Sequence, residues 1–158
     1  MSCCANTRAD CNIYTMTDQT ITRDQFSYWK SVEVRWGDMD AVGHVNNTVY
    51  FVYLESARVE MLHKIGARRA QRNDSQGPAL VSTSCDFKRQ VVYPATIDVG
   101  VRVEKIGNRS FQMSYGLFLH GTDELVATAS SVNAWIDYAL QRAVELPEEL
   151  RAALMEFQ

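Results

Sequence analysis

The feature that most constrains this fold is one long helical pattern, residues 48–65, with strand patterns on either side of it. Apolar residues recur there at steps of three and four, namely Val49, Val52, Tyr53, Ala57, Met61, Leu62 and Ile65. The first half of the segment is apolar or aromatic almost all round. We therefore expect this helix to lie in the core with little solvent face.

Both ends of this helix carry recognisable signals. Asn46 or Asn47 can cap its start with a side-chain oxygen. His63 and Lys64 supply cations to the last turn, and Gly66 can take the left-handed conformation that ends a helix.

The strand patterns have period two. Val32, Val34 and Trp36 alternate with Glu33, Arg35 and Gly37, which predicts a half-buried strand before the helix. After it, a mixed pattern covers residues 79–91, alternation covers 97–103 and 111–119, and residues 124–137 make the last strand. The Gly107-Asn108 pair predicts a hairpin turn. Pro147 fits the first turn of a short closing helix that carries Leu150, Leu154 and Phe157.

These elements predict two parts of the chain. Residues 1–25 are rich in Thr, Asp, Asn and Gln without periodicity, and we expect a mobile lead-in. Residues 26–158 form a single α+β domain with five antiparallel strands and one long helix. Because so small a sheet leaves long edge strands, we expect a homodimer or homotetramer.

Composition excludes several classes of partner. The formal net charge of -3 gives no global field toward nucleic acid or an anionic membrane surface. No stretch of about 18 apolar residues occurs, and the N-terminus lacks the apolar core of a secretory signal. Cys3, Cys4, Cys11 and Cys85 show no metal-ligand spacing. We expect a cytoplasmic protein with free thiols, no metal, no nucleic acid and no membrane.

The segment between the first strand and the helix, residues 38–47, combines two requirements of acyl-group hydrolysis. It carries a carboxylate, and it leads into the start of a buried helix, where backbone N–H groups lack helical partners. Such donors can stabilise a carbonyl oxygen as it becomes an oxyanion. The sequence here reads Asp-Met-Asp-Ala-Val-Gly-His-Val-Asn-Asn.

This segment, together with Arg35-Trp36-Gly37 before it and Tyr50 after it, resembles the hotdog-fold acyl-CoA thioesterases of the 4-hydroxybenzoyl-CoA thioesterase type. The resemblance is tight from residue 32 to about 58 and looser to about 138, where Tyr93-Pro94 fits. It implies an antiparallel five-stranded sheet wrapped around a long central helix. It also implies Asp40 as the catalytic carboxylate and the backbone N–H of Asn47 as the donor to the thioester carbonyl.

Hydrolysis of a thioester needs little more, because a thiolate leaves without strong acid assistance. Asp40 can act as general base on water, which we favour, or as a nucleophile. The resemblance implies no metal or redox cofactor, with coenzyme A present only as part of the substrate. Asp38 has two readings, as a structural acid that caps the turn or as a group that touches the chemistry.

Further substrate contacts are expected from His44, which can orient substrate or water, and from Tyr50 as a wall of the acyl pocket. Glu55 is a candidate because another hotdog branch carries its carboxylate on the central helix; a plain ion pair with Arg58 is the alternative. For the phosphates of coenzyme A we expect the turn Asn108-Arg109-Ser110. Other cations are Arg68, Arg69, Arg72, Lys88, Arg89, Arg102 and Lys105.

Three further functions stay open at this point. An acyl-carrier-protein thioesterase would use the same basic patches. A hotdog dehydratase or hydratase would use Asp40 with His44, although the Asn-Pro element of that branch is missing. A non-catalytic acyl-binding module would not need the desolvated carboxylate. Aromatic residues such as Phe51, Phe87 and Tyr93 suit either an aryl or a fatty acyl group.

Overall fold

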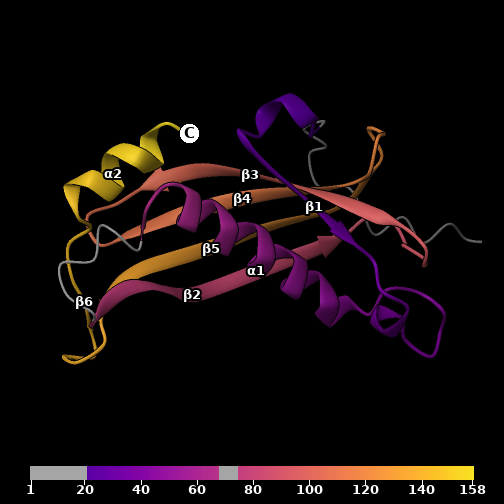
Figure 1. The fold of residues 1–158 in the computed structure, drawn as a ribbon, viewed down its shortest axis with the longest axis horizontal. Helices are drawn as coiled ribbons and strands as arrows, with labels where there is room; N and C mark the ends of the chain where they lie inside the picture. Colours follow the sequence, from indigo (N-terminus) through magenta and orange to yellow (C-terminus); the bar gives the residue numbers. More distant parts are fainter. Residues whose placement is uncertain (1–20, 68–74) are drawn as a thin grey trace, which may run out of the picture.

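A curved antiparallel sheet and one long helix dominate the computed structural model, which describes residues 21–67 and 75–158. The elements, in chain order, are η1 (Arg23–Gln25), β1 (Tyr28–Glu33), η2 (Trp36–Asp38), α1 (Asn47–Lys64), β2 (Gln76–Phe87), β3 (Thr96–Ile106), β4 (Ser110–Leu119), β5 (Leu125–Asp137), β6 (Arg142–Ala143) and α2 (Glu148–Met155). Helix α1 lies along the sheet, and the short α2 lies at the far end of the molecule from the start of α1 (Figure 1).

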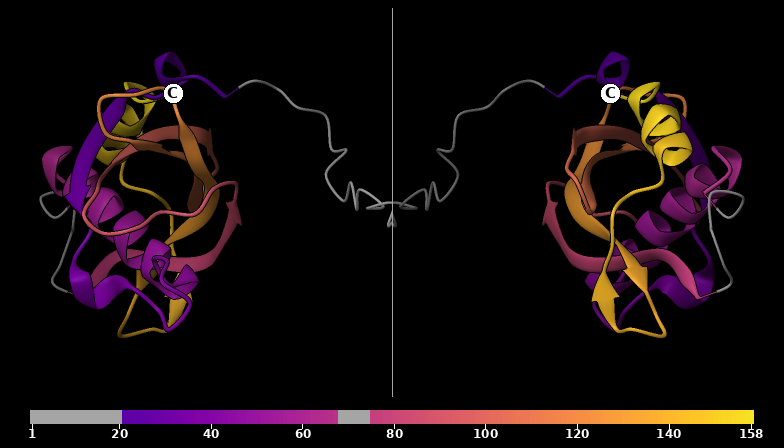
Figure 2. Two further views of the ribbon diagram at one scale, coloured as in Figure 1. Left: turned by 90° about the vertical axis from the view of Figure 1, so that its right-hand side faces the viewer. Right: turned by 90° about the vertical axis from the view of Figure 1, so that its left-hand side faces the viewer.

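The sheet has the order β1-β3-β4-β5-β2, with the two-residue β6 paired to β5. All of its pairings are antiparallel. In the end-on views of Figure 2 the sheet curves around α1, from β1 on one side to β2 on the other. The α+β class, the hotdog fold and the closing helix are therefore confirmed, and β6 is a small addition that the five-stranded prediction did not contain.

The helix-facing side of the sheet forms the core. In the β3–β4 pair, Val99 lies opposite Leu117 and Val101 opposite Tyr115, and all four side chains are buried. Because alternate residues of a strand share a face, the period-two pattern of the sequence places this whole row against α1. The helix contributes four fully buried side chains to the same core, those of Tyr53, Leu54, Ala57 and Met61.

The ends of α1 agree with their sequence signals. The side chain of Asn46 caps the start by accepting a hydrogen bond from the Thr48 N–H at 2.9 Å. At the other end Gly66 has a φ of 75°, the left-handed conformation expected of it. With 18 residues at 1.5 Å each, α1 is about 27 Å long.

The expectation that α1 has little solvent face is wrong. Val52, Glu55 and Val59 are exposed, and they stand at three- and four-residue steps that form one stripe along the helix. The sheet curves around only one side of α1, so a helix that is apolar all round in its first half keeps an uncovered side. Within one chain, periodicity alone predicted too much burial.

The first strand also lies earlier in the chain than predicted, at 28–33 and not at 32–37. β1 ends at Glu33, and Trp36 lies in η2 with 79% of its surface exposed. Asp38 N–H donates to the Arg35 carbonyl at 3.0 Å, which turns the chain out of the sheet. The apolar Trp36 continued the period-two pattern by coincidence, and its side chain lies outside the core.

The closing helix α2 packs as expected. Leu150 and Leu154 are fully buried, and Pro147 precedes the first helical residue. The carbonyl of Phe157 accepts a hydrogen bond from Val103 N–H at 2.7 Å, which fastens the chain end to β3. Among residues 21–67 and 75–158, no helix is long and apolar enough to cross a membrane.

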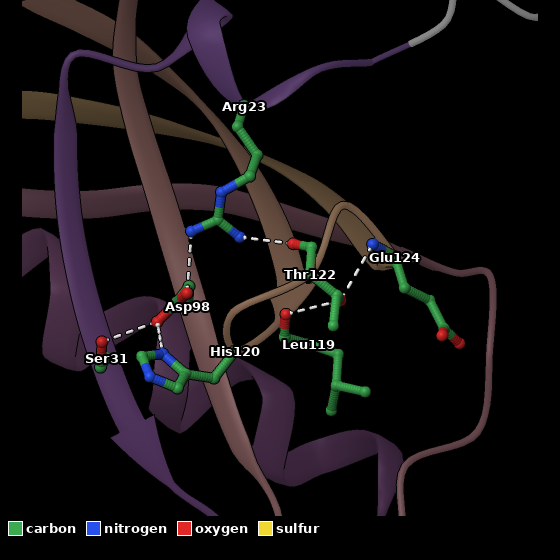
Figure 3. Close-up of polar contacts among 7 residues, drawn as sticks. All are labelled: Arg23, Ser31, Asp98, Leu119, His120, Thr122 and Glu124. Carbon is green, nitrogen blue, oxygen red and sulfur yellow. Dashed lines mark hydrogen bonds and ion pairs between the residues drawn. The ribbon is translucent and has the colours of Figure 1, made fainter.

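Of the predicted lead-in, residues 1–20 lie outside the described residues. Arg23, at its end, contacts the sheet. Its guanidinium donates to the Asp98 carboxylate at 2.8 Å and to the Thr122 carbonyl at 2.9 Å. Figure 3 shows Asp98 at the centre of this cluster, where Ser31 donates to it at 2.6 Å and His120 lies 2.8 Å away through Nδ1.

Acid should weaken this cluster. Burial alone would raise the pKa of Asp98, but hydrogen bonds from Ser31, His120 and Arg23 lower it to about 2. Because the folded pKa lies below the unfolded value, the stabilisation is complete above about pH 4 and is lost as the pH falls toward 2. We expect Asp98→Asn to lower the free energy of unfolding by about 2 kcal/mol at pH 7, and by much less near pH 2.

Urea unfolding at a series of pH values would measure this difference. Asp123→Asn is the matched control, because Asp123 is exposed and its replacement should change stability by less than about 0.5 kcal/mol. A deficit in Asp98→Asn that stays constant from pH 7 to pH 2.5 would show that charge plays no part in the cluster.

Candidate active site

Asp40 opens a tight turn between two chain segments that pair with each other. Met39 and Val45 form an isolated antiparallel bridge, and Asp40 N–H donates to the His44 carbonyl at 2.8 Å. Gly43 closes the turn by donating its N–H to the Asp40 carbonyl at 3.1 Å, with a φ of 88° that disfavours any other residue. The carboxylate therefore stands on a well-defined backbone.

The carboxylate of Asp40 is held by one of its two oxygens. Oδ1 accepts hydrogen bonds from the Val42 N–H at 2.8 Å and from the His44 N–H at 3.4 Å. No described residue donates a hydrogen bond to Oδ2. Asp40 is partly buried, so one oxygen is fixed while the other can meet a water molecule or a substrate.

The same loop ends at the start of α1. Asn46 N–H donates to the Asp38 carbonyl at 2.9 Å, and Thr48 and Val49 donate to the side chain and carbonyl of Asn46. No hydrogen bond joins the N–H of Asn47 to another described residue, as expected for the first helical position. Asn46 is thus the cap, and Asn47 offers a free backbone donor.

The two carboxylates of the Asp-x-Asp pair have different surroundings. Asp38 is 3% exposed and accepts from the Arg35 side chain at 2.7 and 3.0 Å, from Arg35 N–H at 2.9 Å and from the Tyr53 hydroxyl at 2.7 Å. Burial would raise the pKa of Asp38, but these hydrogen bonds hold it below its usual value. Both carboxylate oxygens of Asp38 accept hydrogen bonds, which supports its role as a structural acid that caps the turn.

A cavity of about 610 Å³ adjoins Asp40. Its lining residues are Trp36, Gly37, Met39, Asp40, Ala41, Gly43 and Tyr93. Tyr93 comes from the β2–β3 connection, which is fastened to the loop because Val45 N–H donates to the Val91 carbonyl at 2.9 Å. Asp40 is the only ionisable carboxylate among these lining residues.

Sequence reasoning missed Trp36 and Met39 as cavity residues. Trp36 was assigned to the strand, and Met39 was treated only as the residue between two aspartates. The Gly37 that follows Trp36 was the available signal, because glycine in a strand often marks a break. Tyr93 was named as an aromatic that suits an acyl group, without a position.

His44, Tyr50 and Glu55 follow along the loop and α1. His44 is partly buried on the Asp40 turn. Tyr50 is buried against Tyr53 and Phe87, at ring centroid distances of 6.1 and 5.1 Å, and burial raises its pKa to about 12. It does not line the cavity beside Asp40. Glu55 lies on the exposed stripe of α1, pointing away from the sheet.

The predicted phosphate turn, residues 108–110, lies near the opposite end of α1, beside α2 (Figure 1). The Asn108 carbonyl accepts from Leu146 N–H at 3.0 Å and from Arg151 at 3.3 Å. A second cavity of about 390 Å³ there includes Arg109 and Arg142 in its lining. Within one chain, then, Asp40 and the Asn108-Arg109-Ser110 turn are not brought together.

Two of the other expected cations form surface ion pairs, and three fall outside the described residues. Arg89 pairs with Glu124 at 3.3 Å, and Arg102 pairs with Glu104 at 2.8 Å. Arg68, Arg69 and Arg72 lie outside the described residues.

Comparison with known proteins gives the same fold and a family. The solved structure of PA5185 from Pseudomonas aeruginosa PAO1 is 33% identical, covers 87% of this chain and 95% of its own, and superposes with a TM-score of 0.78. The uncharacterised protein YsmA of Bacillus subtilis is 27% identical over 84% of this chain and 88% of its own. The long-chain acyl-CoA thioesterase FadM of Escherichia coli is 25% identical over 78% of this chain and 93% of its own.

A model of the thioesterase-like superfamily matches residues 34–154, which include the whole Asp40 loop, α1 and the sheet from β2 to β5. This match covers well over half of the chain. The chain therefore belongs to the thioesterase-like superfamily.

Proposed function

We propose that this protein hydrolyses an acyl-CoA thioester to free coenzyme A and a carboxylic acid, with Asp40 as the catalytic carboxylate. The observation that carries the proposal is the state of Asp40. One oxygen is fixed by two backbone N–H groups, and the residue opens onto a cavity of about 610 Å³. A positioned carboxylate with a free oxygen is what a general base requires.

In the proposed reaction Asp40 takes a proton from water, and the resulting hydroxide adds to the thioester carbonyl carbon. The N–H of Asn47 stabilises the oxyanion, a type of contact worth about 3 kcal/mol. The C–S bond then breaks, and coenzyme A leaves as a thiolate. The thiolate is protonated by Asp40, which returns the carboxylate to its starting state. Direct attack by Asp40 to give a mixed anhydride is the alternative route.

The superfamily and the named activity of FadM support a CoA thioester as substrate. Within the superfamily, the Asp-x-Asp pair and the Gly-His-Val-Asn-Asn run favour the 4-hydroxybenzoyl-CoA thioesterase type. His44 would orient the attacking water from the same turn as Asp40. The cytoplasm is the proposed location, since coenzyme A and its thioesters would be met there.

We further propose that the active protein is a homodimer or homotetramer. β2 is an edge strand of 12 residues, and Leu80, Val81 and Phe87 on it are exposed. A second copy that pairs along this edge would cover them. Such pairing would also let Arg109 of one copy reach the phosphates of a substrate that is held at Asp40 of the other copy. Within one chain the two residues are distant.

The proposal predicts that purified wild-type protein releases thiol from at least one acyl-CoA. A panel with acetyl, octanoyl, phenylacetyl and 4-hydroxybenzoyl groups, followed with a thiol reagent, would measure this. An acyl-acyl-carrier-protein substrate tests the carrier-protein alternative, and crotonyl-CoA followed for hydration tests the dehydratase alternative. Binding of acyl-CoA without release of thiol from any member would favour the non-catalytic module.

A further inference from the structure

The cavity beside Asp40 has walls that indicate which part of the substrate it receives. We propose that it holds the acyl group, and that Trp36 and Tyr93 make it select bulky apolar acyl groups over acetyl. This inference rests on the proposed thioester substrate and adds to it the class of acyl group and the residues that recognise it.

The position of the cavity limits its occupant to atoms close to the reacting carbonyl. Asp40 is itself a lining residue, so the cavity adjoins the proposed catalytic residue. Two parts of a CoA thioester are that close to the carbonyl, namely the acyl group and the end of the pantetheine arm. The adenine and the phosphates are much farther along the molecule.

The chemistry of the walls favours the acyl group. Apart from Asp40, the lining side chains are apolar or aromatic, with Trp36, Met39 and Tyr93 the largest. A pantetheine arm carries amides, which lose hydrogen bonds to water when they enter an apolar space. An apolar acyl group loses none and gains the hydrophobic contribution.

The two aromatic walls are available to a ligand. Trp36 is 79% exposed and Tyr93 is 45% exposed. Both residues are connected to Met39 through their backbones. Trp36 lies in η2, where its carbonyl accepts from Met39 N–H at 3.3 Å, and Tyr93 N–H donates to the Met39 sulfur at 3.4 Å. Met39 thus connects both walls, and its polarisable thioether suits contact with a ring or a chain.

These contacts predict selectivity that depends on acyl size. An acetyl group brings a single methyl to the cavity, whereas a phenylacetyl or octanoyl group brings a ring or a chain that can contact the aromatic walls. Each buried methylene raises affinity about fourfold, and aromatic contact adds to that. Truncation of Trp36 should therefore weaken binding of the bulky acyl-CoAs by about tenfold or more and leave acetyl-CoA and free coenzyme A within about twofold.

Binding, not turnover, is the sharper measurement. In the Asp40→Asn background the substrates should remain intact, so calorimetric titration can give Kd values for phenylacetyl-CoA, octanoyl-CoA, acetyl-CoA and coenzyme A. Each is measured with and without Trp36→Ala. Trp36→Phe is the conservative variant and should restore most of the affinity. Val59→Ala, an exposed apolar residue on α1 outside the cavity, should change no Kd.

The outcomes separate this inference from the proposed function. Weakening confined to phenylacetyl-CoA assigns the site to aryl groups, weakening confined to octanoyl-CoA assigns it to fatty chains, and both support an acyl subsite. Equal weakening of all four ligands, or none of any, would overturn it, even if wild type hydrolyses thioesters. If wild type hydrolyses no thioester but Trp36→Ala still weakens only the bulky ligands, the proposed reaction fails and the acyl subsite stands.

Discussion

Asp40→Asn is expected to lower kcat for thioester hydrolysis by at least about a hundredfold, with little change in thermal stability. Removal of a general base typically costs this much. The amide oxygen of Asn can still accept from the Val42 and His44 N–H groups, so the turn should keep its conformation. The loss should appear in kcat, because the carboxylate acts in the chemical step.

Asp123→Asn is the matched control for this substitution, since it removes the same charge from an exposed position outside the site. It should retain wild-type kcat. Circular dichroism and the melting temperature of both variants would show that the fold is intact. A comparable fall in activity in Asp123→Asn would mean that the loss reflects net charge and not the position of Asp40.

Asp38→Ala is expected to act on stability, lowering the free energy of unfolding by about 3 kcal/mol. The substitution leaves the Tyr53 hydroxyl, on a side chain only 2% exposed, without its partner at 2.7 Å. An unsatisfied buried hydroxyl costs about 1 to 3 kcal/mol, and loss of the ion pair with Arg35 adds to it. For a chain of this size the melting temperature should fall by about 6 to 12 °C.

A double-mutant cycle with Tyr53→Phe tests the reason for this loss. Tyr53→Phe alone should cost about 1 kcal/mol. Combined with Asp38→Ala it should cost less than the sum of the two, because both partners of the buried hydrogen bond are then gone. Strict additivity, measured by urea unfolding, would contradict the assigned contact between Asp38 and Tyr53.

Much of the fold could be predicted because burial follows simple periods. In α1 the apolar positions at steps of three and four became the core face, with the exception of the exposed Val52, and in β3 and β4 the alternate residues did. The hairpin turn and the helix ends carry local signals in Asn46, Gly66 and the Gly107-Asn108 pair. The features that depend on neighbouring residues in the chain could therefore be predicted from the sequence.

The parts that failed depend on what packs where in three dimensions. Trp36 fits the strand period but lies outside β1, because the Arg35–Asp38 contacts turn the chain away. Asp98 occupies an outward position in the β3 alternation, yet it is buried because Ser31, Arg23 and His120 close over it. The contact between Met39 and Tyr93 joins residues 54 positions apart, and no local pattern encodes it.

The candidate site was predicted as a segment but not as a cavity. The loop motif and the helix start located Asp40 and Asn47, which remain predictions as catalytic groups. The surroundings that distinguish Asp38 from Asp40 required the structure, because the two carboxylates differ only in their partners. The carboxylate of Asp38 accepts from Arg35 and Tyr53, whereas only one oxygen of Asp40 accepts hydrogen bonds from the described residues, and Asp40 lines the cavity.

The most direct test of the account is a paired measurement of both products from one acyl-CoA substrate. Wild type is predicted to form coenzyme A and the free carboxylic acid in equal amounts, and Asp40→Asn to form both at least about a hundredfold more slowly. A folded Asp40→Asn that forms both products at the wild-type rate would contradict the assignment of Asp40 as the catalytic carboxylate.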